Sequence, residues 1–305
     1  MTNQINLPTS NALIHENQVC TSHPLSQEQI TQYHKEGFVI VPKFFDIEEI
    51  EPVQRALQDN PDLGGMWTIR KNHNDVNTFE VSIWTELDNA LLGVIPRMAR
   101  MLDASSTLLG EECYHWHSKI IRKKPGKGVL EWHQDYDHWY HDGCLFPQLV
   151  TCMIAITINN QKNGCLKILK KSHLMGRINH VIVEKMQNGI EPSRLTAILS
   201  RFEIVYCEMQ PGDALFFHPN IVHSSQPNKS DSPRILMYST YNAASNEPFL
   251  LQGQEHHIYQ KLIKLPDSII KDGGYDSVFE NHKFHAPESK ENPRLGIFYR
   301  HFQEP

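Results

Sequence analysis

From Cys113 onward, the chain is a succession of short apolar, β-branched and aromatic runs separated by Gly, Pro, Asn and Asp residues. Runs of this length and spacing are typical of strands joined by turns, and many of them in one segment indicate a sandwich or barrel. Helical patterns are evident only ahead of this segment. We therefore predict a mainly β fold with flanking helices, a double-stranded β-helix (jelly roll, cupin-like). The expected strands cover residues 114–121, 129–134, 149–158, 166–169, 205–208, 214–218 and 234–241.

Two capping boxes predict where the first helices begin. Ser26–Gln29 and Asp46–Glu49 each place an N-cap residue three positions before a Gln or Glu, so helices should start there. Between them, Phe38–Phe45 reads as a short apolar strand that Pro42 interrupts. We expect residues 59–74 to form a loop. Residues 89–109 carry an apolar stripe with helical spacing, which should pack on a sheet.

The composition indicates a globular protein with a sizeable core. The 305 residues are 40% hydrophobic and 21% charged. A formal net charge of -6 argues against nucleic acid or an anionic membrane as the main partner. Lys123-Lys124 and Lys170-Lys171 are short pairs that we expect on the solvated surface. The expected division is a flexible N-terminal arm (residues 1–25), a single domain (26–268) and a C-terminal extension (269–305).

Several features place the chain in the cytoplasm. No apolar run approaches the roughly 20 residues of a membrane span, and the N-terminus lacks the basic and apolar regions of a secretory signal. Six scattered cysteines without a CxxC pair indicate free thiols in a reducing compartment.

One His-x-Asp pair and a distant histidine suggest a metal centre. His133 and Asp135 would point to one face of a strand, because side chains alternate with period two. His223 would supply the third ligand from another strand; His218 is a rival, although Pro219 directly after it suggests a strand end. Two imidazoles and one carboxylate form the facial triad that holds non-haem Fe(II) with open positions. The opposing interpretation is that these are ordinary buried histidines.

An arginine follows the distal histidine after eleven residues. The planar guanidinium of Arg234 would suit the carboxylate of a cosubstrate, because it can pair with both carboxylate oxygens. Ser225 lies between the two residues. Another cupin-like metal enzyme would not need Arg234 and Ser225, and a non-catalytic binding protein on the same fold would not need the three metal ligands.

Three motifs carry a family resemblance: WHQDYDHWYHDG (132–143), NGCLKILKKSHLMGRI (163–178) and PGDALFFHPNIVHSSQPNKSDSPR (211–234). They resemble the phytanoyl-CoA dioxygenase family of Fe(II)/2-oxoglutarate oxygenases, over roughly residues 30 to 260. The resemblance implies that His133, Asp135 and His223 ligate iron. It also implies that Arg234 and Ser225 hold the distal carboxylate of 2-oxoglutarate, and that O2 is the oxidant. Lys119 would face the cosubstrate or the substrate, although a solvent-facing lysine is an alternative.

Two details refine this resemblance. Lys170-Lys171-Ser172-His173 stands where the family usually carries Pro-Gly-Ser-His, which puts the conformation of that loop in doubt but removes no ligand. Relatives that halogenate replace the carboxylate with a small residue. Because Asp135 is intact, hydroxylation is favoured.

The substrate is less constrained. Trp132, Tyr136, Asp137, Trp139 and Tyr140 surround the His-x-Asp pair, and aromatic faces with a carboxylate could hold a cationic group; the alternative is that they simply pack the barrel mouth. The spacing to Trp139 is similar to the ectoine hydroxylase branch, although the intervening residues differ. An acyl-CoA would favour a basic patch, which the sequence does not show. We expect a small-molecule substrate, a small polar and perhaps amine-bearing metabolite rather than an acyl-CoA, and the sequence leaves the oligomeric state open.

Overall fold

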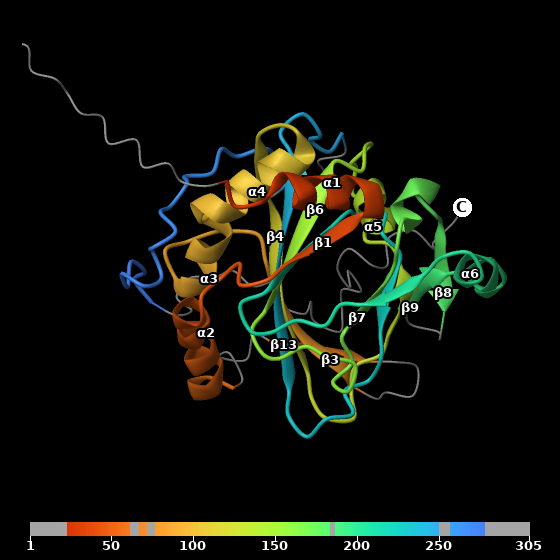
Figure 1. Ribbon diagram of the computed structural model, residues 1–305, viewed down its shortest axis with the longest axis horizontal. Helices are drawn as coiled ribbons and strands as arrows, with labels where there is room; N and C mark the ends of the chain where they lie inside the picture. Colours follow the sequence, from red (N-terminus) through yellow and green to blue (C-terminus); the bar gives the residue numbers. More distant parts are fainter. Residues whose placement is uncertain (1–22, 62–66, 72–76, 184–186, 250–256, 278–305) are drawn as a thin grey trace, which may run out of the picture.

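Two antiparallel sheets form the centre of the molecule (Figure 1). A computed structural model describes residues 23–61, 67–71, 77–183, 187–249 and 257–277. The larger sheet has the strand order β1-β11-β6-β13-β4-β3-β2, and the smaller has the order β10-β7-β12-β5. This two-sheet arrangement confirms the mainly β, jelly-roll prediction. The strands of the larger sheet are β1 (Phe38–Val41), β2 (Thr68–Lys71), β3 (Asn77–Trp84), β4 (Cys113–Lys123), β6 (Leu149–Ala155), β11 (Ala214–Phe217) and β13 (Arg234–Ala243). Those of the smaller sheet are β5 (Leu130–His133), β7 (Leu166–Leu169), β10 (Ile204–Tyr206) and β12 (His223–Ser225), and β8 (His180–Val183) pairs separately with β9 (Gln187–Ile190).

The central strands of the larger sheet are buried on both faces, which explains their continuous apolar sequences. In β11, Phe216 belongs to the cluster under the helices, whereas Leu215 belongs to the cluster between the sheets. The same alternation places Cys152 of β6 under the helices and Met153 between the sheets. One face of the sheet therefore anchors the helices, and the other is available to line a site.

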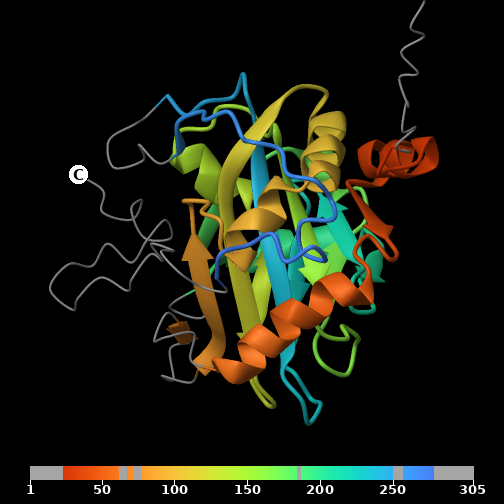
Figure 2. The same ribbon diagram turned by 90° about the vertical axis from the view of Figure 1, so that its left-hand side faces the viewer.

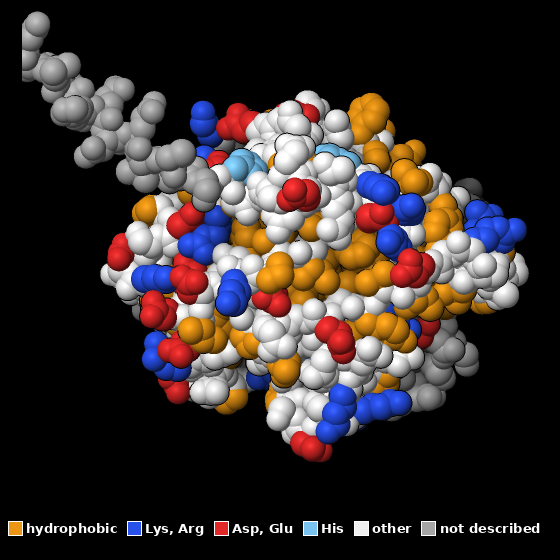
Figure 3. Space-filling view, in the orientation of Figure 1, with side chains coloured by type: hydrophobic (Ala, Val, Ile, Leu, Met, Phe, Trp, Pro, Cys, Tyr) orange, Lys and Arg blue, Asp and Glu red, His pale blue; other side chains and the backbone are white. Residues whose placement is uncertain are grey.

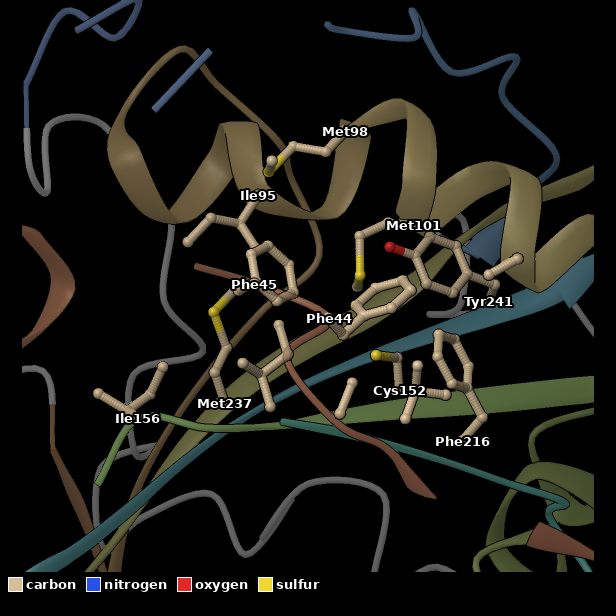
Figure 4. Packing of buried hydrophobic residues seen from close by; sticks show 14 of the residues in the cluster. Phe44, Phe45, Ile95, Met98, Met101, Cys152, Ile156, Phe216, Met237 and Tyr241 are labelled. Carbon is tan, nitrogen blue, oxygen red and sulfur yellow. The ribbon is translucent and has the colours of Figure 1, made fainter. Parts of the chain in front are cut away.

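Four helices cover the outer face of the larger sheet. Figure 2 shows α2 running across this face. Figure 4 shows Met98 and Met101 of the helical layer lying over Phe44, Phe216 and Tyr241. Both capping boxes are present at Ser26 and Asp46, so the predicted helix starts are confirmed. The helices of this layer are α1 (Gln27–Glu36), α2 (Ile47–Asp59), α3 (Leu91–Val94) and α4 (Ala99–Leu109), with a 3-10 turn at Ile95–Arg97 between the last two.

Some elements differ from the sequence-based expectation. The strand β2 lies inside residues 59–74, where we expected only a loop. This strand is stabilised by its pairing with β3, which the sequence Thr-Ile-Arg-Lys does not indicate. The expectation that helices occur only ahead of the strands is also wrong: α5 (Tyr136–His141) and α6 (Pro192–Leu199) lie among them. The Glu191 side chain caps α6 by accepting from two backbone N–H groups, a local signal that was missed.

The ends of the chain are only partly described. Residues 1–22 of the expected N-terminal arm and residues 278–305 of the expected extension lie outside the described residues. The described part of the extension contacts the helical layer, where Ile270 is buried in the same cluster as α4. The proposed division into arm, domain and extension stays a prediction.

Figure 3 shows Lys, Arg, Asp and Glu side chains interspersed over one face of the molecule, without a continuous patch of one sign on that face. Within the described ranges, no helix combines the length and apolarity needed to cross a membrane.

Candidate metal and cosubstrate site

The strands β5 and β12 bring two predicted ligands together. The two strands pair antiparallel, with His133 directly opposite His223, and the two imidazole centroids are 4.1 Å apart. Asp135 is not in a strand: β5 ends at His133, and Asp135 has helical backbone angles (φ -65°, ψ -33°) at the start of α5. The expected alternation within one strand is therefore wrong. The backbone turns from strand to helix after His133, and this turn carries the Asp135 carboxylate back to the imidazoles.

These three side chains form a cluster that could hold a metal ion. Their ligand atoms all lie within 4.8 Å of one another, and no other such cluster was found in the described part of the chain. Asp135 Oδ1 is 3.7 Å from His133 Nε2 and 4.0 Å from His223 Nε2. The Nδ1 atom of His133 lies 2.7 Å from the Glu131 carbonyl, and that of His223 lies 3.1 Å from the Ile221 carbonyl. Because a carbonyl only accepts, each Nδ1 carries the hydrogen and each Nε2 is left with a lone pair for a metal.

The protonation states of the cluster also suit a divalent cation. Burial lowers the pKa of His223 to about 3, so its imidazole is neutral at physiological pH. Burial is the largest influence on Asp135 and raises its pKa, but Lys119, His223 and His133 together hold it well below the usual range. Asp135 is therefore ionised. Neutral imidazoles and an ionised carboxylate are the forms that bind metals, and this ligand set fits Fe(II).

The rival histidine lies elsewhere. The ring of His218 is 5.3 Å from that of His173, and its Nδ1 accepts a hydrogen bond from the Asn220 backbone at 3.0 Å. His218 is not part of the cluster. The structure thus brings His223, rather than His218, to His133 and Asp135.

A second polar cluster lies at the other end of β12 and contains two buried cations. Arg234 and Lys123 are each 1% exposed and lie opposite one another on β13 and β4. Arg234 Nη1 donates to the Gly164 carbonyl at 2.5 Å, while its buried Nε has no hydrogen-bond partner among the described residues. Lys123 Nζ donates to Ser225 Oγ at 2.6 Å and to the Gln226 carbonyl at 3.0 Å.

This cluster favours an anion, which would keep both groups charged. Burial and the neighbouring Arg234 lower the pKa of Lys123 well below its ordinary value, and burial also lowers that of Arg234. Across the described ranges, neither cation forms an ion pair with Asp or Glu. Two adjacent buried charges are unfavourable without a counter-charge, and guanidinium and ammonium groups both donate to carboxylates. The pair Arg234 and Ser225 was expected here. Lys123 was not, and its expected place on the solvated surface is wrong.

Lys119 lies between the two clusters on the inner face of β4. Side chains alternate along a strand, so Lys119, Ile121 and Lys123 share a face, and Ile121 belongs to the cluster between the sheets. Lys119 Nζ lies 5.1 Å from the centroid of the Tyr238 ring. It is the strongest of the influences that lower the pKa of Asp135. Lys119 therefore faces the interior near the triad rather than open solvent, and its ligand stays a prediction.

The aromatic residues around the triad are packed into two separate groups. Tyr136 and Trp139 are each 3% exposed in one apolar cluster, where the Tyr136 hydroxyl donates to the Cys144 carbonyl at 3.1 Å. Trp132 belongs to another cluster, and Lys167 Nζ lies 4.8 Å from the centroid of its ring. These contacts account for the burial of the three rings, and their role toward a substrate stays a prediction.

Asp137 already has a cationic partner, Arg177, within the chain. Its Oδ1 is 3.1 Å from Arg177 Nη1, and its Oδ2 is 3.4 Å from His180 Nδ1. The guanidinium of Arg177 also lies 4.1 Å from the centroid of the Tyr140 ring. The combination of carboxylate and aromatic ring that we expected to hold a substrate cation therefore holds Arg177. A cationic substrate would have to compete with it, and the role of Asp137 toward a substrate stays a prediction.

The loop that departs from the family pattern keeps a left-handed residue. Lys171 has φ 68°, in the left-handed region that favours glycine. Its N–H donates to the Glu36 carbonyl at 2.8 Å, and the next residue, Ser172, accepts from the Val222 N–H at 2.7 Å. Contacts with α1 and with the residue before His223 therefore hold the loop in place without Pro and Gly.

Comparisons with known proteins identify the family and the fold that this chain resembles. The family model of phytanoyl-CoA dioxygenase (PhyH) matches residues 33–236. The ectoine dioxygenase of Bordetella bronchiseptica is 26% identical over 238 residues, which cover 73% of this chain and 77% of that protein. The methylphosphonate hydroxylase of Gimesia maris is 25% identical over 224 residues, covering 72% and 81%. The crystal structure of EctD from S. alaskensis with 2-oxoglutarate and 5-hydroxyectoine has a TM-score of 0.62 at 22% identity, covering 75% and 79%, and it supports the fold assignment.

Proposed function

The chain belongs to the phytanoyl-CoA dioxygenase family, and we propose that it hydroxylates a C–H bond of a small polar metabolite. It is a non-haem Fe(II)/2-oxoglutarate-dependent dioxygenase. In our assignment, His133, Asp135 and His223 hold Fe(II), while Arg234 and Ser225 bind the distal carboxylate of 2-oxoglutarate. The observation that carries this assignment is that the metal-competent triad and the buried cationic cluster lie at the two ends of β12.

When bound, Fe(II) and 2-oxoglutarate would supply the oxidation, which converts O2, 2-oxoglutarate and the substrate into succinate, CO2 and the hydroxylated product. The chain supplies orientation. The Glu131 and Ile221 carbonyls fix the tautomers of the two histidines, and the Gly164 carbonyl holds the Arg234 guanidinium in place. The apolar cluster between the sheets excludes water from the inner face of β4 and β13.

The intact carboxylate at Asp135 supports hydroxylation over halogenation. The names of the relatives, an ectoine dioxygenase and a methylphosphonate hydroxylase, both point to small polar substrates. An acyl-CoA is the alternative within the family. A metabolite screen that reads succinate release coupled to consumption of the added compound separates these classes.

We also place this enzyme in the cytoplasm. In the described part of the chain, five cysteines are buried free thiols, which supports a reducing compartment. Neither nucleic acid nor a membrane is an expected partner.

The assignment is tested by anaerobic titration with Fe(II) and 2-oxoglutarate, which should give the weak visible charge-transfer band of a chelated keto acid. His223→Ala should abolish the band because it removes a ligand, whereas the control His218→Ala should keep it because that ring contacts His173 instead. Absence of the band in folded wild-type protein, or its persistence in His223→Ala, would refute the assignment.

A further inference from the structure

Lys123 is buried in a position that constrains its neighbour Ser225. Its ammonium donates to Ser225 Oγ at 2.6 Å and to the Gln226 carbonyl at 3.0 Å. The side chain is confined at Gly128, where a methyl group would lie only 2.3 Å from Lys123 Cδ. Lys123 thus has little freedom to point elsewhere.

The chemistry of the two groups then fixes the direction of the hydrogen bond. An ammonium group has three donors and no acceptor, whereas a hydroxyl group has one donor and two acceptor lone pairs. Ser225 must therefore accept from Lys123, and its own hydrogen must point to another group. Among the described residues, Lys123 is the only hydrogen-bond partner found for Ser225 Oγ. The Ser225 hydrogen is left available for a ligand, as is the buried Nε of Arg234.

We propose that Lys123 is a positioning residue of the cosubstrate site: by donating to Ser225 Oγ, it directs the Ser225 hydroxyl hydrogen toward the distal carboxylate of 2-oxoglutarate. This inference rests on the proposed function, which places that carboxylate beside Arg234 and Ser225. Lys123 also adds a second positive charge to the cluster. A 2-oxo acid of the same length without the distal carboxylate would leave both charges without a counter-ion, so the pair selects a dicarboxylate cosubstrate.

Lys123→Met tests this role against the matched control Lys124→Met. Lys124 is the next residue, but its side chain is 55% exposed and pairs with Glu80 at 2.7 Å. The dissociation constant of 2-oxoglutarate is measured by the anaerobic charge-transfer titration, and kcat by succinate release at saturating 2-oxoglutarate. Lys123→Met should raise the dissociation constant roughly 10- to 100-fold, which corresponds to about 1.4 to 2.8 kcal/mol, with kcat within about 2-fold of wild type. Lys124→Met should change neither quantity.

A double-mutant cycle with Ser225→Ala separates positioning from a general charge effect. If Lys123 acts through Ser225, then Lys123→Met should weaken 2-oxoglutarate binding much less in the Ser225→Ala background than in wild type. Fully additive effects would overturn the positioning role, as would equal dissociation constants for Lys123→Met and Lys124→Met. Should Lys123→Met not fold, Lys123→Leu provides the same test, because its side chain has no hydrogen-bond donor for Ser225. A wild-type enzyme that forms no band would refute the proposed function; a normal wild-type band with no difference between the two lysine variants would refute only the inference.

Discussion

Substituting Gly164 with alanine should weaken 2-oxoglutarate binding without touching any proposed ligand. The Gly164 carbonyl accepts the hydrogen bond from Arg234 Nη1 at 2.5 Å. Its Cα faces the backbone that follows Ser225, so that a methyl group would lie 2.1 Å from the Gln226 carbonyl oxygen and 2.9 Å from that of Pro227. Gly164 therefore contacts both Arg234 and the backbone that follows Ser225, the two residues that we assign to the distal carboxylate. A methyl group at Gly164 must displace one of these two contacts.

The size of the effect follows from these distances. Relieving a 2.1 Å contact to the separation of ordinary non-bonded atoms requires a backbone shift of about 1.5 Å. Such a shift would disrupt a hydrogen bond to a charged group, worth roughly 1.5–3 kcal/mol, which is about 10- to 150-fold in the dissociation constant of 2-oxoglutarate. Gly164 also has φ +73°, a conformation that costs a residue with a side chain about 1–2 kcal/mol. The combined loss of stability, about 2.5–5 kcal/mol, is at or below the lower end of the roughly 5–15 kcal/mol of an ordinary domain, so Gly164→Ala should fold.

Gly126→Ala is the matched control. Gly126 has φ +74°, but a methyl group there would meet no atom within 4 Å. Both variants share the backbone strain, and only Gly164→Ala has the steric contact. Urea unfolding should show a loss of about 1–2 kcal/mol for Gly126→Ala and a larger loss for Gly164→Ala, and only the latter should bind 2-oxoglutarate weakly in the anaerobic titration. If Gly164→Ala bound 2-oxoglutarate as tightly as Gly126→Ala, the coupling between Gly164, Arg234 and Ser225 would be wrong.

Two further predictions concern stability. Burial lowers the pKa of His115 from 6.5 to about 4. As the pH falls, His115 is therefore protonated in the unfolded chain before it is protonated in the folded chain. The free energy of unfolding that is present above pH 6.5 is then progressively lost toward pH 4. Between pH 7.5 and 5, His115→Gln should therefore lose about 2 kcal/mol less stability than wild type in urea unfolding; parallel losses in the two proteins would contradict this assignment. Lys171→Gly should raise the melting temperature, because it removes the strain of a left-handed lysine, about 1 kcal/mol, while its backbone hydrogen bond to Glu36 is kept; an unchanged or lower melting temperature would show that the greater freedom of glycine in the unfolded chain outweighs this strain.

The parts of the fold that depend on local sequence could be predicted. Helices α1 and α2 begin where their capping boxes indicate, because each box satisfies backbone groups within four residues of chain. Strand β2 could not be predicted in the same way. Its four residues are ordered by pairing with β3, and nothing in their own alternation indicates a buried face.

The triad was predicted for a partly incorrect reason. Its residue types and spacing identified His133, Asp135 and His223, but the expected geometry assumed a continuous strand. The structure ends β5 at His133 and begins α5 directly after Asp135. Both geometries bring Asp135 close to His133, so the residue assignment did not depend on which one was correct. A motif can therefore identify ligands more securely than it identifies the backbone that presents them.

Lys123 shows the opposite case, because its function depends on a register that no local pattern contains. In the sequence it belongs to the run Arg-Lys-Lys-Pro-Gly-Lys, whose composition is typical of a solvated turn. In the fold it is the last residue of β4 and lies opposite Arg234, a residue more than one hundred positions later.

One signal in the sequence did indicate the inward orientation of Lys123. Strand alternation places Lys123 on the same side as Ile121 and Lys119, and an apolar residue between two lysines on one face argues that this face is inward. Because Lys123 and Arg234 both point inward without an acidic partner, they imply a ligand that carries the missing negative charge. The same reasoning applies to any strand in which charged side chains point to the same face as the core side chains. The counter-ion of such a charged residue lies on a neighbouring strand or in a bound molecule.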